Sequence, residues 1–229
     1  MDVVANNIAN SNTTAFKREG IEFDTYLSHG NPQQALSFVV DKATYRDAAT
    51  GPIQPTGNDL DLAIQGQGYF AVQTKDGKTA YTRNGSFQLN AAGEMVTHTG
   101  EKVLNDGGQA ITFPDTTTQI NISSDGFVTA RVDNNVNLAE LGKLPVFKFD
   151  NEQELKSQGN GLYTTRQTAA ISQNSSVIQG SIEQSNVSPV TEMTEMIRIM
   201  RTYEQTSNLI GQENQRQDDA INKLSKTTA

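Results

Sequence analysis

One pair of carboxylates has the type and spacing that could perform chemistry. Asp59 and Asp61 stand two residues apart, and two facing carboxylates can act as general acid and base in glycan hydrolysis. Residues two apart on a strand share only one face, and no acidic partner or metal-loop glycine stands at a suitable offset. We therefore interpret Asp61, inside the apolar stretch Leu60 to Ile64, as a hydrogen-bonded or solvent-facing strand residue.

A glycine-rich turn is the second candidate. Gly66-Gln67-Gly68 follows a strand-like stretch, as the glycines of a dinucleotide-binding loop do. In such a loop the glycines open a helix whose N-terminus receives the pyrophosphate. Tyr69 to Thr74 instead alternates with a period of two and continues into Asp76-Gly77, which predicts another strand. The segment is interpreted as a tight bend with close backbone packing.

Imidazole and thiolate chemistry have few candidates. The 229 residues include no cysteine and two histidines, His29 and His98, each close to a turn glycine. A disulfide framework, a thiolate zinc site and a cysteine nucleophile are therefore excluded. We predict no catalytic residue, no metal site and no cofactor, and expect the chain not to be an enzyme.

The charge pattern argues against nucleic acid. Eighteen Lys and Arg against 26 Asp and Glu give a net charge of −8, whereas nucleic-acid binders gather positive charge. Lys17-Arg18 is too short for a basic patch. No apolar run approaches a membrane span, and no cationic start precedes an apolar stretch. We expect no nucleic-acid partner, no membrane insertion and no cleaved signal peptide.

The elements that must position any functional surface form a β middle between helical ends. Residues 21–65 carry scattered turn formers and predict an extended connector. Residues 66–165 place Asp-Gly and Asn-Gly turns at regular spacing between short apolar runs, which predicts an antiparallel β domain. Residues 166–187 are expected to return as strands toward the connector. The predicted fold class is α+β, mainly β, with long N- and C-terminal helices that form a coiled-coil-like end region.

Residues 1–20 begin with a helical pattern. Met1, Val4 and Ile8 fall along one face, and the pattern stops in the polar run that begins at Asn10. An isolated helix needs about 12 to 15 residues in water, so this short helix must pack against another element.

Residues 188–229 predict a long helix. Ser188 suits the N-cap and Pro189 the first helical position, and the pattern continues to about Lys226. Its apolar residues recur at heptad spacing, and those proposed to form a seam are Met193, Met196, Ile197, Met200, Tyr203 and Ile210. The heptad positions are polar across Ser207, Asn214 and Gln217 and apolar again at the end, at Ile221 and Leu224. Because the chain offers only a short N-terminal helix against this seam, we expect partner chains to cover it.

Three ordered groups of segments resemble the flagellar rod and hook family of bacteria. They are residues 5–18, with Ala15 where glycine is commoner; residues 56–70, 81–87 and 93–97; and residues 179–204. The resemblance implies a non-enzymatic subunit whose terminal helices assemble into a tubular, torque-transmitting wall. The interface residues that it implies in the N-terminal signature are Asn6, Asn7, Ile8, Asn10, Thr13 and Phe16, together with the seam above.

The resemblance also implies partners and a location. The partners are other rod proteins, copies of the chain itself and the flagellar type III export apparatus, and the location is the periplasmic rod of the basal body. Family members normally have further helical turns before the position of Met1. The length and the single compact β middle are most like the proximal rod member, and the distal rod member is the alternative. A secreted glycan-acting enzyme or adhesin built on the β domain is the alternative from another class.

Overall fold

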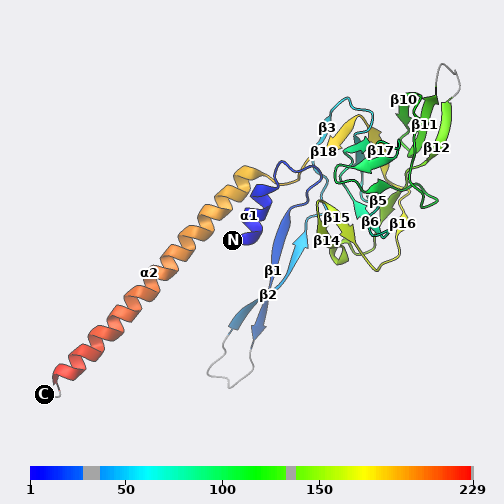
Figure 1. Cartoon of the computed structure of the whole chain (residues 1–229). Coiled ribbons are helices and arrows are strands. Elements are labelled where there is room, and N and C mark those ends of the chain that lie inside the picture. The colour runs from blue at the N-terminus through cyan, green and yellow to red at the C-terminus, as the bar shows by residue number, and fades with distance from the viewer. Residues whose placement is uncertain (28–36, 133–137, 228–229) are drawn as a thin grey trace. The chain divides into compact units, whose positions relative to one another are not determined.

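The structure, a computed structural model, describes residues 1–27, 37–132 and 138–227 and divides into two compact units (Figure 1). The helical unit consists of Met1–Ala9 and Ser188–Ala229, and the β unit is Asn10–Val187. The chain therefore enters the β unit at residue 10 and leaves it at residue 187.

The helical unit contains two helices of unequal length. α1 (Asp2–Ala9) has 8 residues, and α2 (Pro189–Thr227) has 39. The predicted start of the long helix at Pro189 is confirmed, and a long helix at the N-terminal end is not found. The predicted apolar face of Met1, Val4 and Ile8 is only partly buried: Val4 is buried, Ile8 is half-buried and Met1 is 50% exposed. The other buried residue of α1 is the polar Asn7.

The β unit is built from short strands and one 3-10 turn, η1 (Glu152–Glu154). The strands are β1 (Glu19–Leu27), β2 (Ser37–Arg46), β3 (Ile53–Pro55), β4 (Leu62–Gln65), β5 (Tyr69–Gln73), β6 (Thr79–Thr82), β7 (Phe87–Leu89), β8 (Met95–Thr97), β9 (Lys102–Val103), β10 (Thr117–Ile122), β11 (Phe127–Val132), β12 (Leu138–Lys143), β13 (Val146–Lys148), β14 (Lys156–Gly159), β15 (Leu162–Thr164), β16 (Ala170–Ile171), β17 (Ser176–Gln179) and β18 (Ser181–Glu183).

All strand pairs are antiparallel, which confirms the predicted class of the β middle. The largest sheet runs β14-β15-β6-β5-β9-β8-β7; β13 also pairs with β5, and β16 pairs with β13. β10, β11 and β12 form a separate three-stranded sheet (Figure 1). The returning strands β17 and β18 pair with β4 and β3. The main core is apolar, with Phe70, Leu62, Ile64, Met95 and Ile111 among its buried side chains.

The segment expected as an extended connector holds regular structure. β1 and β2 pair as a hairpin, and β3 and β4 follow. Residues 28–36, which include His29, lie outside the described residues. The missed signal was alternation in Glu19–Leu27, where apolar Ile21 and Phe23 are interleaved with acidic residues. Conversely, Ile111 and Phe113 are buried, but the exposed Thr112 between them forms only a single bridge, with Glu94.

Ala15 adopts a backbone conformation that L residues rarely take. Its φ is 57°, its side chain is buried, and its N–H donates to the Glu183 carbonyl at 2.8 Å. The left-handed region costs an L residue roughly 1 to 2 kcal/mol, whereas glycine enters it freely. The local conformation thus explains why glycine suits this position.

We expect Ala15→Gly to leave the free energy of unfolding within about 1 kcal/mol of the parent, because relief of the left-handed conformation offsets the added unfolded-state entropy. Ala15→Val should lower it by about 2 kcal/mol or more, since a β-branched residue is strained at positive φ and overfills a buried site. Urea denaturation followed by circular dichroism measures both. A glycine variant less stable than the valine variant would contradict this assignment.

Candidate subunit interface

The predicted seam lies on the surface of α2. Met193 is 49% exposed, Ile197 52%, Met200 47% and Tyr203 72%, and Ile210 is exposed as well. Met196 is half-buried. Contiguous apolar side chains at this level of exposure usually mark a surface that another molecule covers. We call these six residues the α2 seam.

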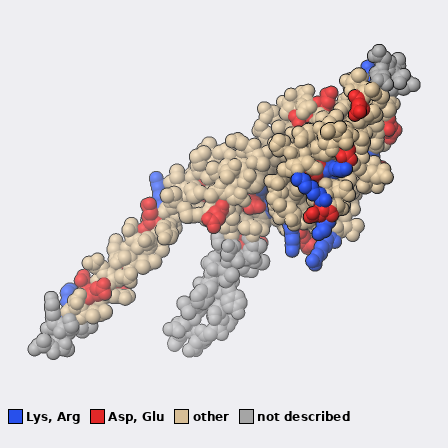
Figure 2. Space-filling model, in the orientation of Figure 1, with Lys and Arg blue, Asp and Glu red and all other residues tan. Residues whose placement is uncertain are grey.

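The two helices differ too much in length for one to cover the other. At 1.5 Å per residue, the 8 residues of α1 span roughly 12 Å and the 39 residues of α2 roughly 58 Å. Every described side chain from residue 201 to residue 223 is exposed. Most of the visible face of α2 consists of residues other than Lys, Arg, Asp and Glu (Figure 2). The described part of the chain therefore leaves most of the α2 seam open to solvent.

α1 packs on the first turns of α2 through a buried polar pair. The Asn7 amide donates to a carboxylate oxygen of Glu192 at 3.2 Å, and both residues are at most 1% exposed. A buried carboxylate needs such partners, which fixes the register of the two helices. Asn7 thus contacts its own chain, whereas Asn6 is exposed and Ile8 is half-buried.

The remaining predicted N-terminal residues belong to the β unit. The Thr13 hydroxyl donates to the Asn10 side chain at 3.2 Å, and the Thr13 N–H donates to the Asn10 carbonyl at 3.0 Å. Thr13 is exposed, whereas Asn10 and Phe16 are half-buried. The Phe16 carbonyl accepts from the N–H of Asn186 at 3.3 Å, so this segment follows the returning end of the chain.

Lys17, the residue after Phe16, belongs to a buried cluster of charges that was not predicted from the sequence. Glu183 is 1% exposed and pairs with two buried cations: Lys17 Nζ lies 2.6 Å from one carboxylate oxygen, and Arg83 Nε lies 2.7 Å from the other. Lys17 also donates to the Ala49 carbonyl at 2.7 Å, and the Gly51 N–H donates to Glu183 at 2.9 Å. Burial lowers the pKa of Lys17 from its ordinary value, while its hydrogen bond to Glu183 acts in the opposite direction.

The hydrogen bonds of Arg83 explain the conformation of the glycine-rich turn at residues 66–68. Its guanidinium donates to the carbonyls of Gly66 at 2.6 Å, Gly68 at 2.8 Å and Ile64 at 3.3 Å. A phosphate loop directs N–H groups at its ligand, whereas this turn directs carbonyl oxygens at a cation. Gly68 has a φ of 134°, and an added Cβ would lie 2.5 Å from Val146. The prediction of a tight, closely packed bend agrees with this geometry.

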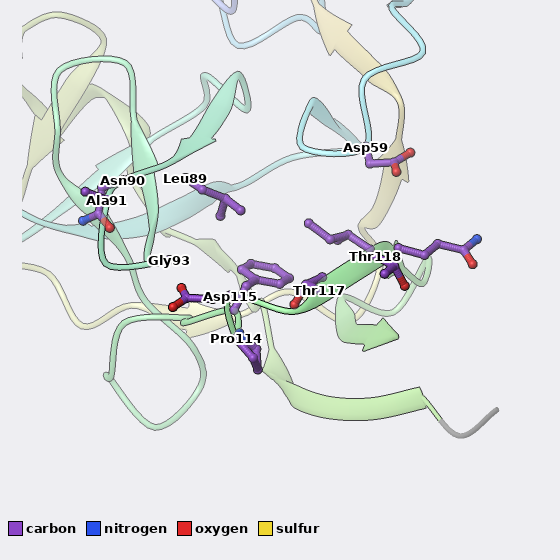
Figure 3. A pocket seen from close by; sticks show the side chains of 12 residues that line it. Asp59, Leu89, Asn90, Ala91, Gly93, Pro114, Asp115, Thr117 and Thr118 are labelled. Carbon is purple, nitrogen blue, oxygen red and sulfur yellow. The ribbon is translucent and has the colours of Figure 1, made fainter. Parts of the chain in front are cut away.

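The carboxylates with possible chemistry do not share a site. Asp61 is buried and accepts from the Ser86 hydroxyl at 3.2 Å, as expected for a hydrogen-bonded strand residue. Asp59 lines a surface cavity of about 320 Å³ whose lining also includes Leu89, Phe113 and Asp115. Asp59 and Asp115 lie on different sides of this cavity (Figure 3).

The other candidates have ordinary roles. His98 is exposed in the turn that the Gly100 N–H closes on the Thr97 carbonyl. Among residues 1–27, 37–132 and 138–227, no group of three or more His, Asp or Glu side chains is placed to hold a metal ion. None of the helices in these ranges is long and apolar enough to cross a membrane.

Three family profiles match this chain in order. The profile described as "Flagella basal body rod protein" matches residues 1–17, "Flagellar hook protein FlgE/F/G D1 domain" matches residues 63–130, and "Flagellar basal body rod FlgEFG protein C-terminal" matches residues 178–223. Together they cover both terminal helices and a large part of the β unit.

Individual relatives extend over nearly the whole chain. The flagellar basal-body rod protein FlgF of Caulobacter vibrioides is 35% identical over 99% of this chain and 92% of its own length, and FlgF of Mesorhizobium japonicum is 34% identical over 98% and 91%. The rod protein FlgG of Agrobacterium fabrum is 36% identical over 92% and 88%.

The matched profiles and relatives are all structural proteins of the flagellum. The chain belongs to the flagellar basal-body rod protein family, and within it the chain is FlgF-like. It is a structural subunit of the bacterial flagellar basal body, it interacts with other rod and basal-body proteins, and its family is not one of enzymes. The resemblance drawn from the sequence is thereby confirmed.

Proposed function

We propose that the chain joins the rod through its terminal helices, with the α2 seam as the apolar contact. The open apolar surface of α2 is the observation that carries this proposal. Burying apolar surface releases roughly 25 cal/mol per Å², so several seam residues together contribute a few kcal/mol or more. Neighbouring terminal helices, from other rod proteins or from copies of this chain, offer the complementary surface.

The N-terminal residues have two roles in this proposal. Asn7 is paired with Glu192 and holds α1 against α2, so it positions the contact surface without contacting a neighbour itself. Asn6, Ile8, Asn10, Thr13 and Phe16 retain exposed surface with which they contact neighbours. The relatives named FlgF support a proximal place in the rod, and FlgG-like distal placement is the alternative. Export through the flagellar type III apparatus, without a cleaved signal peptide, to a periplasmic rod completes the proposal.

Amide hydrogen exchange tests whether assembly orders α2. In the free chain, amides of residues 201–223 should exchange at least about tenfold faster than those of residues 193–196, because helices without tertiary packing are marginal in water. In isolated basal bodies the same amides should be strongly protected. Equally slow exchange along all of α2 in the free chain would contradict the dependence on partners.

Basal-body imaging tests the place in the rod. A host strain that lacks its own gene for this chain should have truncated rods and should not swim, and the chain supplied in trans should restore both. Rods that are intact without the chain would contradict the proposal. Rods that stop after the proximal part would favour the distal alternative.

A further inference from the structure

Both chain segments that connect the β unit to the helical unit meet at Glu183. The incoming segment reaches Lys17 eight residues after Ala9, and Glu183 stands five residues before Ser188. The side chain of Glu183 holds Lys17, and its carbonyl accepts from the N–H of Ala15 at 2.8 Å. The incoming segment is therefore bonded to the last residue of β18, at the point where the outgoing segment leaves the sheets.

A third segment, residues 47–53, is hydrogen-bonded to the same outgoing segment. The Asn186 side chain accepts from the Arg18 N–H at 2.6 Å and donates to the carbonyls of Asp47 at 3.1 Å and Ala49 at 2.9 Å. A Cβ on Gly51 would lie 1.9 Å from the Gln184 carbonyl oxygen, so no side chain fits between these segments.

Arg83 anchors this junction in the main sheet region. It links Glu183 to the carbonyls of the turn between β4 and β5, whose strands supply Ile64 and Phe70 to the core. A force that arrives along either connecting segment meets charged hydrogen bonds before it reaches the apolar core. Such bonds, shielded from water, are stronger and more directional than apolar contacts.

We propose that Lys17, Glu183 and Asn186 form a mechanical clamp that transfers load from the terminal helices to the β unit. The inference rests on the proposed function only for the origin of the load, which is the rod in which the helices are held. In this role Lys17 and Asn186 are positioning residues: they keep both connecting segments seated when the helices are pulled.

Single-molecule force measurement on the full chain tests the clamp. The chain has no cysteine, so paired cysteine handles can be placed freely. Asp2→Cys with Asp76→Cys applies load through the incoming segment, and Asp76→Cys with Asp125→Cys applies it across the β unit alone. Lys17→Met removes the charge and its hydrogen bonds, and Lys17→Arg retains the charge.

At constant force, Lys17→Met should shorten the lifetime of the folded β unit about tenfold or more in the first geometry. It should change the lifetime less than about twofold in the second geometry, and Lys17→Arg should recover much of the loss. The matched control is Lys102→Met, which removes the partly exposed ion pair with Glu94 in the same unit and should have little effect in either geometry. Equal shortening in both geometries, or none in the first, would overturn the clamp.

Asn186→Ala keeps the test decisive if Lys17→Met does not fold. It removes three clamp hydrogen bonds at a half-buried position while leaving the ion pairs in place. The same difference between the two geometries is expected, and its absence overturns the proposal. Because single chains are pulled, a failure of the α2 seam to support assembly would leave this result unchanged, and the two proposals are judged separately.

Discussion

Replacing Met200 with glutamate is expected to leave the free chain folded and to abolish its incorporation into the rod. Met200 is 47% exposed, so a carboxylate there remains hydrated in the free chain and the melting temperature should stay close to that of the parent. Once neighbours cover the α2 seam, the unpaired charge costs about 3 kcal/mol or more, roughly a 100-fold loss of affinity.

The measurement is swimming and the yield of complete rods in a strain that carries only the variant. Gln205→Glu is the matched control, since it adds the same charge at an exposed position roughly 140° around the helix from Met200. This control should assemble. Met200→Gln, which has a similar shape and no charge, should give an intermediate yield. Normal rods from Met200→Glu would show that the α2 seam is not the contact.

Replacing Arg83 with methionine should destabilise the β unit more than any surface substitution. The change removes one of the two cations around a carboxylate that is 1% exposed, and it removes the guanidinium donor of three carbonyls, two of them buried. Breaking a buried pair on one side costs about 3 to 5 kcal/mol, so the melting temperature should fall by roughly 10 °C.

Thermal melting of purified chains measures this effect, and Arg83→Lys separates charge from shape. Lysine retains the charge but cannot reach three carbonyls and a carboxylate at once, so most of the loss should remain. Lys102→Met, which breaks a partly exposed pair, should change the free energy of unfolding by no more than about 1 kcal/mol. If Arg83→Met were as mild as this control, the cluster would not be what stabilises the turn between β4 and β5.

Local signals in the sequence predicted several of the elements but none of the buried polar contacts. Ser188 and Pro189 mark the start of α2, and the apolar run Phe127 to Val132 coincides with β11, because caps and alternation act within a few residues. The β1–β2 hairpin was missed although Glu19–Leu27 alternates, because the turn formers scattered through residues 21–65 are also typical of an extended connector.

The cluster around Glu183 could not be predicted in this way. Lys17 lies 166 residues from Glu183 in the sequence and Arg83 lies 100 residues from it, so only the tertiary fold brings them together. The available hint was weak: Arg83 and Glu183 are single charges beside strand-forming residues, where an isolated charge needs a partner. The partner of Asn7 could not be predicted for the same reason, because Glu192 lies 185 residues away in the sequence.

The polar stretch of the heptad pattern on α2 affects how assembly of such subunits is nucleated. Beyond Tyr203 the apolar heptad positions Ile210, Ile221 and Leu224 are separated by the polar positions Ser207, Asn214 and Gln217. Two free copies that pair side by side therefore bury apolar side chains only in short, interrupted stretches. Association costs about 4 to 15 kcal/mol in lost translational and rotational freedom, which so short an apolar contact does not offset. In the proposed assembly, a growing end offers several terminal helices to each incoming chain, so one addition buries more apolar surface and offsets that cost. The unassembled pool is therefore expected to remain monomeric below a critical concentration, with growth by addition to an existing tip rather than by spontaneous nucleation in solution.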